Sequence, residues 1–181
     1  MQATVMEREV TLDPEKSYEI VNGQPEEKEM PGARHGIVAM RLALKLGAFV
    51  LEHKLGEAST EANFKLSKNE RIPDLSFVAA DRIPAEGIPA GVWQIPPDLA
   101  VEIISPNDLH EKVSNKVLEY LEAGVKQVWL VSPENRAVTI FRSMDQVQVI
   151  AGDRKLESPD LLPGFSCALA EIFPAVVSVE T

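Results

Sequence analysis

The sequence has one cysteine, Cys167, among 181 residues. An intrachain disulfide is therefore impossible, and a lone thiol fits a reducing compartment such as the cytoplasm. No apolar run approaches the roughly 20 residues of a membrane-spanning helix. The stretch from Met1 to Thr11 lacks the apolar segment after a basic start that marks a secretory signal. We therefore expect a cytoplasmic protein without a membrane partner.

Several catalytic signatures are also missing. The chain has no Cys/His cluster with zinc-ligand spacing, no glycine-rich phosphate-binding loop and no Ser-His-Asp set. Internal repeats and low-complexity segments are absent as well. With 45% apolar and 25% charged residues, the composition is that of an ordinary globular protein. A chain of this length predicts one domain over residues 1–181, with its core at about 18–142.

Positive charge is scarce. Lys and Arg number 18 against 28 Asp and Glu, giving a net charge of −10. Because neutralisation of phosphates by Lys and Arg drives much of nucleic-acid binding, an acidic chain should bind duplex weakly unless its positive residues cluster or bound cations help. One stretch could supply such a cluster, although an ordinary solvated face is the alternative. Its members are Arg34, Lys45, Lys54, Lys65, Lys68 and Arg71.

Local patterns predict the first elements. Asn22-Gly23 predicts the tight turn of a hairpin over residues 18–28. A helix is predicted over about 34–54, where apolar residues recur at helical spacing. We expect its core-facing stripe to be Ile37, Met40, Leu44 and Leu51, widened by Val38, Leu42 and Phe49.

The remaining pattern predicts strands at 58–66, 74–79 and 99–104, a helix at 109–123, a strand at 127–131, a hairpin at 137–151 and a short helix near Ala168. This order predicts an α/β (α+β) fold whose central sheet is backed by the two long helices. Trp129 and Phe141 are expected in the core. Trp93, in the Pro/Gly-rich loop at 83–97, either packs under that loop or contributes to a dimer contact.

Two carboxylates occupy unusual positions. Glu102 interrupts an apolar run, and a buried charge is costly unless a counter-ion compensates it. Asp74 follows Pro73 at the start of another predicted strand. If the two strands are neighbours, both acids can reach one Mg²⁺, which prefers carboxylate and water oxygens. The alternatives are an edge ion pair for Glu102 and an ordinary loop-to-strand signal for Asp74.

A lysine on the following helix could complete such a site. Lys116 could stabilise the negative charge that develops on a phosphodiester, while Lys112, one turn earlier, is a competitor for this role. Asp98 falls on the same strand face as Glu102 by two-residue alternation and could support the site from behind.

These residues resemble a known family. Pro73-Asp74, the string Val101-Glu102-Ile103-Ile104-Ser105-Pro106, Lys116 with Tyr120, Ala123-Gly124-Val125 and Val128-Trp129-Leu130-Val131 are similar to the restriction endonuclease-like family that is widespread in bacteria, a branch of the PD-(D/E)xK nuclease superfamily. The segments Tyr18 to Gly23 and Arg34-His35 resemble its N-terminal part. The resemblance implies a restriction endonuclease-like core with a four-stranded mixed sheet flanked by helices, to which N- and C-terminal hairpins are added.

The resemblance also implies a chemistry. Asp74 and Glu102 would be the metal-binding acids of a Mg²⁺-dependent phosphodiesterase, with Mn²⁺ as a substitute, and Lys116 its catalytic lysine. The superfamily pattern places that lysine two residues after the glutamate, where this chain has Ile104, so the lysine has moved to the next helix. Glu19 would be an accessory acid acting through water, and His35 would contact phosphate or metal; a surface charge and a structural histidine are their alternatives.

The sequence therefore favours a Mg²⁺-dependent endonuclease that acts on DNA as a homodimer. Two other classes stay open. The fold could serve as a catalytically silent interaction or regulatory module, because fold does not fix function. It could also hydrolyse a smaller phosphoester, which suits an acidic protein better than duplex DNA does.

Overall fold

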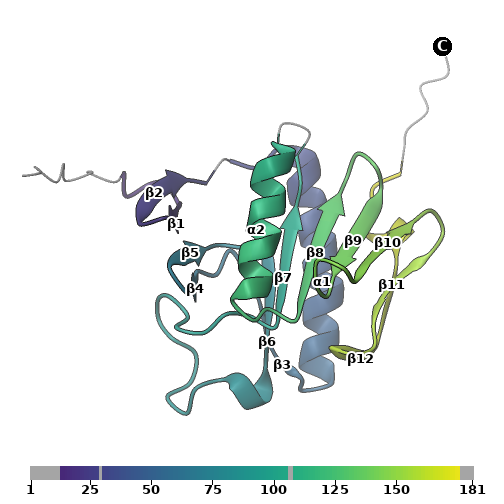
Figure 1. The fold of residues 1–181 in the computed structure, drawn as a ribbon. Helices are drawn as coiled ribbons and strands as arrows, with labels where there is room; N and C mark the ends of the chain where they lie inside the picture. Colours follow the sequence, from purple (N-terminus) through teal and green to yellow (C-terminus); the bar gives the residue numbers. More distant parts are fainter. Residues whose placement is uncertain (1–12, 29, 106–107, 176–181) are drawn as a thin grey trace, which may run out of the picture.

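A six-stranded mixed sheet lies at the centre of the molecule, in the order β10-β9-β8-β7-β6-β3 (Figure 1). The structure is a computed structural model that describes residues 13–28, 30–105 and 108–175, so the stretch tested above for a secretory signal lies outside the described residues. The sheet comprises β3 (Gly56–Thr60), β6 (Leu75–Ala79), β7 (Leu99–Ile103), β8 (Gln127–Ser132), β9 (Ala137–Phe141) and β10 (Val147–Ala151).

The pairing directions explain the connections. β7 and β8 run parallel, and helix α2 (His110–Glu122) makes the crossover that parallel strands need. Every other neighbouring pair in this sheet is antiparallel. The predicted mixed sheet flanked by helices is confirmed. It has six strands rather than four because the β9–β10 hairpin extends one edge beyond β3, β6, β7 and β8.

Helix α1 (Ala33–Glu52) covers one face of the sheet. Its buried row is Val38, Leu42, Leu46 and Val50, each fully inaccessible to solvent. The predicted core stripe was wrong in part: Val38 and Leu42 are buried as expected, but Ile37, Met40, Leu44 and Leu51 are between 45% and 68% exposed. With 3.6 residues per turn the two apolar rows lie on nearly opposite sides of the helix, and the sheet receives the i, i+4 row.

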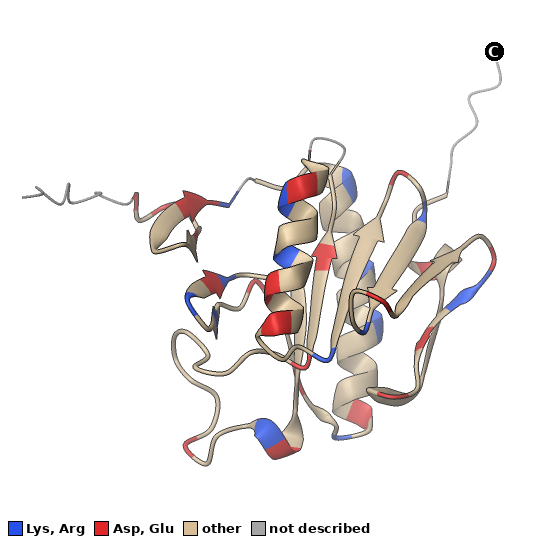
Figure 2. Cartoon of the chain, viewed as in Figure 1, with Lys and Arg blue, Asp and Glu red and all other residues tan. Residues whose placement is uncertain are grey.

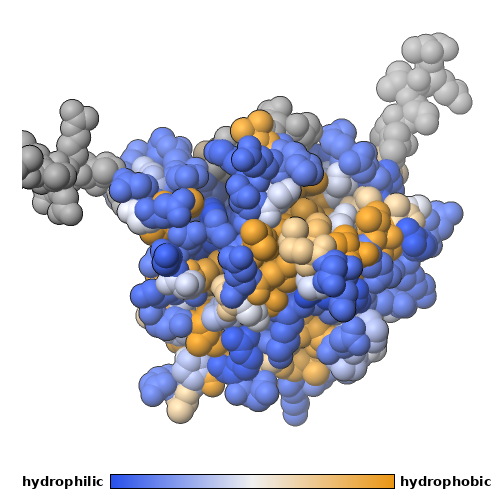
Figure 3. Space-filling model, in the orientation of Figure 1, coloured by the Kyte–Doolittle hydropathy of each residue, from blue (hydrophilic) through white to orange (hydrophobic). Residues whose placement is uncertain are grey.

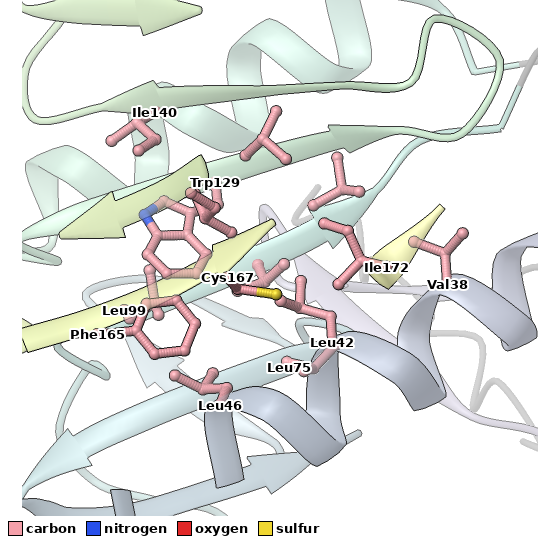
Figure 4. Close-up of a cluster of buried hydrophobic side chains, with 14 of the residues drawn as sticks. Val38, Leu42, Leu46, Leu75, Leu99, Trp129, Ile140, Phe165, Cys167 and Ile172 are labelled. Atoms are coloured by element: carbon pink, nitrogen blue, oxygen red, sulfur yellow. The ribbon is translucent and has the colours of Figure 1, made fainter. Parts of the chain in front are cut away.

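The C-terminal segments complete the core on the α1 face. A hairpin of β11 (Lys155–Ser158) and β12 (Leu162–Ala168) leads into the short helix α3 (Leu169–Ile172). Trp129, Phe165 and Cys167 pack beside Leu42 and Leu46 of α1 (Figure 4). The short helix was predicted from the sequence, but the hairpin before it was not.

A second sheet lies near the α2 side of the molecule, in the order β2-β1-β5-β4. It contains β1 (Tyr18–Val21), β2 (Gln24–Glu27), β4 (Phe64–Leu66) and β5 (Asn69–Arg71). The predicted N-terminal hairpin is confirmed. The single strand predicted over 58–66 was wrong, because the chain turns after β3 and begins a separate hairpin, β4–β5, that pairs with β1.

The long loop after the 3₁₀ helix Ala80–Arg82 is anchored by Trp93. This side chain is 5% exposed and stacks on Phe64 with ring centroids 5.9 Å apart. Its backbone N–H donates to Asn63 and its carbonyl accepts from Lys65. Of the two interpretations of Trp93, packing under the loop is therefore correct. Among the described residues, no helix combines the length and apolar character needed to cross a membrane.

Candidate functional site

A polar cavity of about 400 Å³ opens where the second sheet meets α2 and the end of β7. Its position follows from the register of the central sheet. Leu75 of β6 is opposite Val101 of β7, so Asp74, one residue earlier, arrives beside Glu102. The Ile103 N–H donates to Asp74 Oδ2 at 2.7 Å and fixes this approach. The cavity is lined by Glu19, His35, Arg71, Asp74, Glu102 and Lys116, among others.

Glu102 projects from β7 toward α2, as does the buried Ala100 two residues earlier. Tyr120 donates its hydroxyl to Glu102 Oε1 at 2.7 Å, and the Lys116 ammonium lies 3.0 Å from the same carboxylate. Burial raises the pKa of Glu102, and the negative charges of Asp74 and Glu19 raise it further. The positive charge of Lys116 acts to lower this pKa but does not outweigh them. A further cation near Glu102 would therefore be favoured.

The pKa of Asp74 is lowered, in contrast to that of Glu102. Although burial acts to raise its pKa, the hydrogen bond with His35, the Lys28 charge and the Ile103 N–H lower the pKa to about 2. His35 Nε2 lies 3.0 Å from Oδ2 and Lys28 Nζ lies 3.1 Å from Oδ1. Asp74 is thus held as a carboxylate, and both of its oxygens have partners.

Lys116 joins the two acids supplied by different sheets. Its Nζ lies 3.0 Å from Glu19 Oε1 and 3.0 Å from Glu102 Oε1. Burial acts to lower the pKa of Lys116, but Glu102 and Glu19 outweigh it and raise the pKa, so the ammonium stays charged. Lys112 also lines the cavity but is exposed, and within the described ranges it has no ion pair. Geometry thus favours Lys116 over its competitor.

Glu19 is a buried member of the cluster, with 8% of its surface exposed. It accepts the Ile72 N–H at 2.9 Å and the Arg71 Nη1 donor at 3.0 Å. Burial acts to raise the pKa of Glu19, but Lys116, the Ile72 N–H and Arg71 lower it. Its direct ion pair with Lys116 argues against the alternative of a hairpin surface charge.

Two neighbouring contacts hold this arrangement in place. Arg71 makes a two-pronged ion pair with Glu119 of α2, with distances of 2.7 and 2.9 Å to Oε2. His35, at the start of α1, has a raised pKa because it hydrogen-bonds to Asp74. Its Nδ1 is buried and has no hydrogen-bond partner among the residues that the structure describes.

Lys28 was missed by the sequence analysis. Its Nζ donates to Glu61 at 2.8 Å, to the Ile72 carbonyl at 2.9 Å and to Asp74 at 3.1 Å. Nothing in the sequence signals this role, because a lysine within an acidic run is typical of a solvated surface. Tyr120 was part of the family resemblance, but its contact with Glu102 could not be inferred without the packing of α2.

Asp98 does not support the cavity. It lies before the opposite end of β7, fully buried, where it accepts the Ala79 N–H at 2.8 Å. Arg82 and Lys126 compensate its charge at 3.0 and 2.8 Å. Three residues of β7, Leu99 to Val101, separate Asp98 from Glu102, and the charge partners of Asp98 lie outside the cavity lining.

The predicted basic stretch does not form one surface. Arg71 is buried in the cavity, Lys45 pairs with Glu171 and Arg34 pairs with Glu134. Figure 2, in which the cartoon is coloured by residue type, shows both acidic and basic positions along α2. Most of the positive charge that lines the cavity is paired with carboxylates, and Lys112 is the exception among the described residues.

The donor set of the cavity suits a metal ion in one coordination mode only. Within the described part of the chain, no group of three or more His, Cys, Asp or Glu is placed to hold one. Mg²⁺, however, commonly uses one or two carboxylates and takes its other ligands from water and phosphate oxygens. Asp74 and Glu102, side by side in one polar cavity, fit that mode, whereas a closed all-protein cage does not fit.

Comparisons with known proteins show the fold and the family of this chain. One solved structure, described as a putative nuclease belonging to DUF820 from Anabaena variabilis, superposes with a TM-score of 0.80. It is 23% identical and the match covers 90% of this chain and 93% of that one, which confirms the predicted fold class. A search of curated proteins gave no significant match. A family model described as "Putative restriction endonuclease" matches residues 5–170, so the chain belongs to this family, Uma2.

Proposed function

We propose that this protein is a divalent-metal-dependent endonuclease that hydrolyses DNA phosphodiester bonds in the polar cavity. One observation carries the proposal: Glu102, partly buried on β7, lies beside Asp74 while Lys116 bridges Glu102 and Glu19 at 3.0 Å from each. Membership of a restriction endonuclease family and the name of the structural neighbour support the nuclease class.

Asp74 and Glu102 would hold the cation, Mg²⁺ or Mn²⁺. When bound, such an ion supplies positive charge against phosphate oxygens and activates water. Asp74 suits this role because its pKa of about 2 keeps it ionised at any physiological pH. Glu102 suits it because the raised pKa that burial and its acidic neighbours cause would fall when a cation arrives.

The other residues of the cavity would position the two acids or stabilise charge on the phosphate. Lys116 stays protonated, so its role is to stabilise negative charge on the phosphate rather than to accept a proton. Tyr120 orients Glu102 through its 2.7 Å hydrogen bond. His35 orients Asp74, and the Arg71–Glu119 pair holds Glu19 against Lys116.

Amide substitution of the acids tests the proposal. Glu102→Gln and Asp74→Asn keep side-chain size but remove the charge that a cation needs. We expect each to reduce Mg²⁺- or Mn²⁺-dependent cleavage of plasmid and oligonucleotide DNA by about 100-fold or more. Titration calorimetry with each metal should show binding to the wild-type protein that both variants weaken.

The matched control is Glu157→Gln, the same change at an exposed position of β11, away from the cavity. It should keep full activity. Cleavage that persists in Glu102→Gln at the wild-type rate would reject the assignment of the site. Absence of both metal binding and cleavage in the wild-type protein would favour the silent interaction module.

A hydrolase of smaller phosphoesters is the second candidate, favoured by the net charge of −10. An acidic protein is repelled by the dense phosphates of a duplex more than by a single phosphodiester. Assays of dinucleotides and bis(p-nitrophenyl) phosphate beside plasmid DNA separate the candidates. Turnover of the small diesters alone would select the second.

We also propose that the protein is a homodimer that associates through the outer face of α1. The exposed residues Ile37, Met40, Leu44 and Leu51 form an apolar row along this helix, and such a row at the surface is typical of an interface. Sedimentation velocity should show a dimer that Leu44→Glu dissociates. A wild-type monomer at all accessible concentrations would contradict this.

A further inference from the structure

A second cavity, of about 250 Å³, lies immediately beside the polar one. The two cavities share a wall made by the end of β7, the first turns of α2 and β8. The shared residues are Ile104, Ser105, Asp108, Val113, Val117 and Leu130. Phe141 of β9, Met144 and the α2 residues His110 and Ser114 complete the second cavity.

The chemistry of the second cavity differs from that of the first. Its floor is apolar, formed by Leu130, Phe141 and Val117, and polar groups are confined to His110, Ser114, Ser105 and Asp108. Figure 3 shows apolar surface gathered beside α2 and over β8 and β9 on this face. An apolar recess with a few polar groups matches a flat ring that has apolar faces and hydrogen-bonding edges.

We propose that this second cavity binds one unpaired nucleobase next to the phosphate that is cleaved, so that the preferred substrate is single-stranded or has an unpaired nucleotide at the cleavage position. The inference rests on the proposed function. Its basis is continuity: a site for a phosphate and a recess for a ring share a wall, as the phosphate and base of one nucleotide require. Enzymes that take a base out of its stack hold it in such a recess.

The charge of the molecule supports an unpaired base over intact duplex. Duplex binding depends on Lys and Arg that are free to neutralise phosphates. Near the cavity Lys28, Arg71 and Lys116 are each already paired with carboxylates, which leaves Lys112 as the one cavity-lining cation without an ion pair among the described residues. Stacking of a base in an apolar recess supplies affinity without that charge, which reconciles an acidic protein with a nucleic-acid substrate.

Binding can be measured apart from cleavage. A single-stranded oligonucleotide carrying 2-aminopurine is titrated into wild-type protein in EDTA, and its fluorescence reports stacking of the base. We expect binding with a changed emission for the single strand. The duplex, and an oligonucleotide with an abasic position in place of the fluorescent base, are measured as competitors of that labelled strand and should bind at least about tenfold more weakly.

Two variants locate the base. Ser114→Trp fills the recess and should weaken single-strand binding by about tenfold, and Phe141→Leu keeps the floor apolar but removes its ring and should weaken it less. Ile88→Trp, on the exposed loop, is the matched control for an added indole. Thermal unfolding checks that each variant is folded; if Ser114→Trp does not fold, Ser114→Leu replaces it.

The outcomes separate the two proposals. Single-strand binding that Ser114→Trp weakens, without any metal-dependent cleavage by the wild type, would reject the nuclease and keep the base site. Metal-dependent cleavage with equal affinity for duplex, abasic and single-stranded DNA, unchanged in Ser114→Trp, would keep the nuclease and overturn the base site.

Discussion

The Lys116 ammonium pairs with buried Glu19 and with partly buried Glu102. Replacing it by an apolar side chain would leave Glu102 with the Tyr120 hydroxyl alone, whereas Glu19 would keep Arg71. We expect Lys116→Met to reduce cleavage by about 100-fold and to lower the free energy of unfolding by about 1–3 kcal/mol, the cost of removing one partner of a desolvated polar group. Single-turnover cleavage and urea unfolding measure the two effects.

Lys112→Met is the matched control for that change, since the two lysines lie one turn apart on α2 and both line the cavity. Because Lys112 is exposed, its loss should leave stability within about 0.5 kcal/mol of the wild-type value. Comparable losses of cleavage in both variants would show that geometry does not identify the catalytic lysine.

Asp98 is the clearest source of pH-dependent stability outside the site. Burial acts to raise its pKa, but the Ala79 N–H, Lys126 and Arg82 lower the pKa below its ordinary value. Its contribution to stability is therefore full above the unfolded-state pKa, near 4, and is lost as the pH falls through the lowered pKa. We expect Asp98→Asn to cost about 1–3 kcal/mol at neutral pH, a difference that narrows below about pH 4.

Urea unfolding of wild type and Asp98→Asn across this pH range tests the sign. A difference that widens toward acid would contradict the compensated carboxylate. Cleavage by the variant should stay near the wild-type rate at temperatures where it is folded, because Asp98 lies away from the polar cavity.

The residues of the polar cavity differ in how much of their placement the sequence could predict. Asp74 directly precedes one strand and Glu102 lies inside another. The two acids could therefore be predicted as neighbours on condition that these strands pair, as β6 and β7 do. Lys28 was not predictable, because its three contacts come from Glu61, Ile72 and Asp74, which only the tertiary fold assembles.

At the scale of elements, α1 shows why apolar spacing predicts a helix better than its orientation. Both rows of the helix are apolar, so the spacing of apolar residues does not decide which row packs on the sheet. A related limit hid the β4–β5 hairpin: Phe64, Lys65 and Leu66 of β4 alternate between buried and exposed, but over only three residues, and the partner strand β5 is entirely polar. Local pattern therefore predicted the element types, whereas burial was decided by packing partners distant in sequence.

Trp93 makes the long loop a structural element rather than a free lid. We expect Trp93→Ala to lower the free energy of unfolding by about 3–5 kcal/mol, because it leaves a cavity against Phe64. Ile88→Ala on the same loop removes a 59% exposed side chain and should change it by no more than about 0.5 kcal/mol. Thermal or urea unfolding compares the two; a Trp93→Ala protein as stable as wild type would show that the loop is not anchored here.

At the scale of the whole molecule, two sheets and two helices bring acids and cations together where β7 ends. The central sheet supplies Glu102 and places Asp74, the second sheet supplies Glu19 and Arg71, and α2 supplies Lys116. No single element contains the site. A variant that displaces the second sheet would therefore remove Glu19 and Arg71 together, even with the central sheet intact.

The net charge of −10 leads to a prediction about how the affinity for nucleic acid depends on salt. Proteins that bind through six to ten phosphate contacts lose about 10³ to 10⁵ in affinity between about 50 and 200 mM salt. Here Lys28, Arg71 and Lys116 are already paired with carboxylates. Among the described residues that line the cavity, Lys112 is the one cation without an ion pair, so base stacking would supply most of the affinity. We expect the affinity for a single-stranded oligonucleotide in EDTA to fall by less than about tenfold over that range, corresponding to roughly two phosphate contacts.

Fluorescence anisotropy at several salt concentrations measures how steeply the affinity falls with salt. In Lys112→Met this dependence on salt should become shallower. A steep fall of affinity with salt would mean that phosphate neutralisation dominates despite the net negative charge, and that basic residues outside the polar cavity contact the strand.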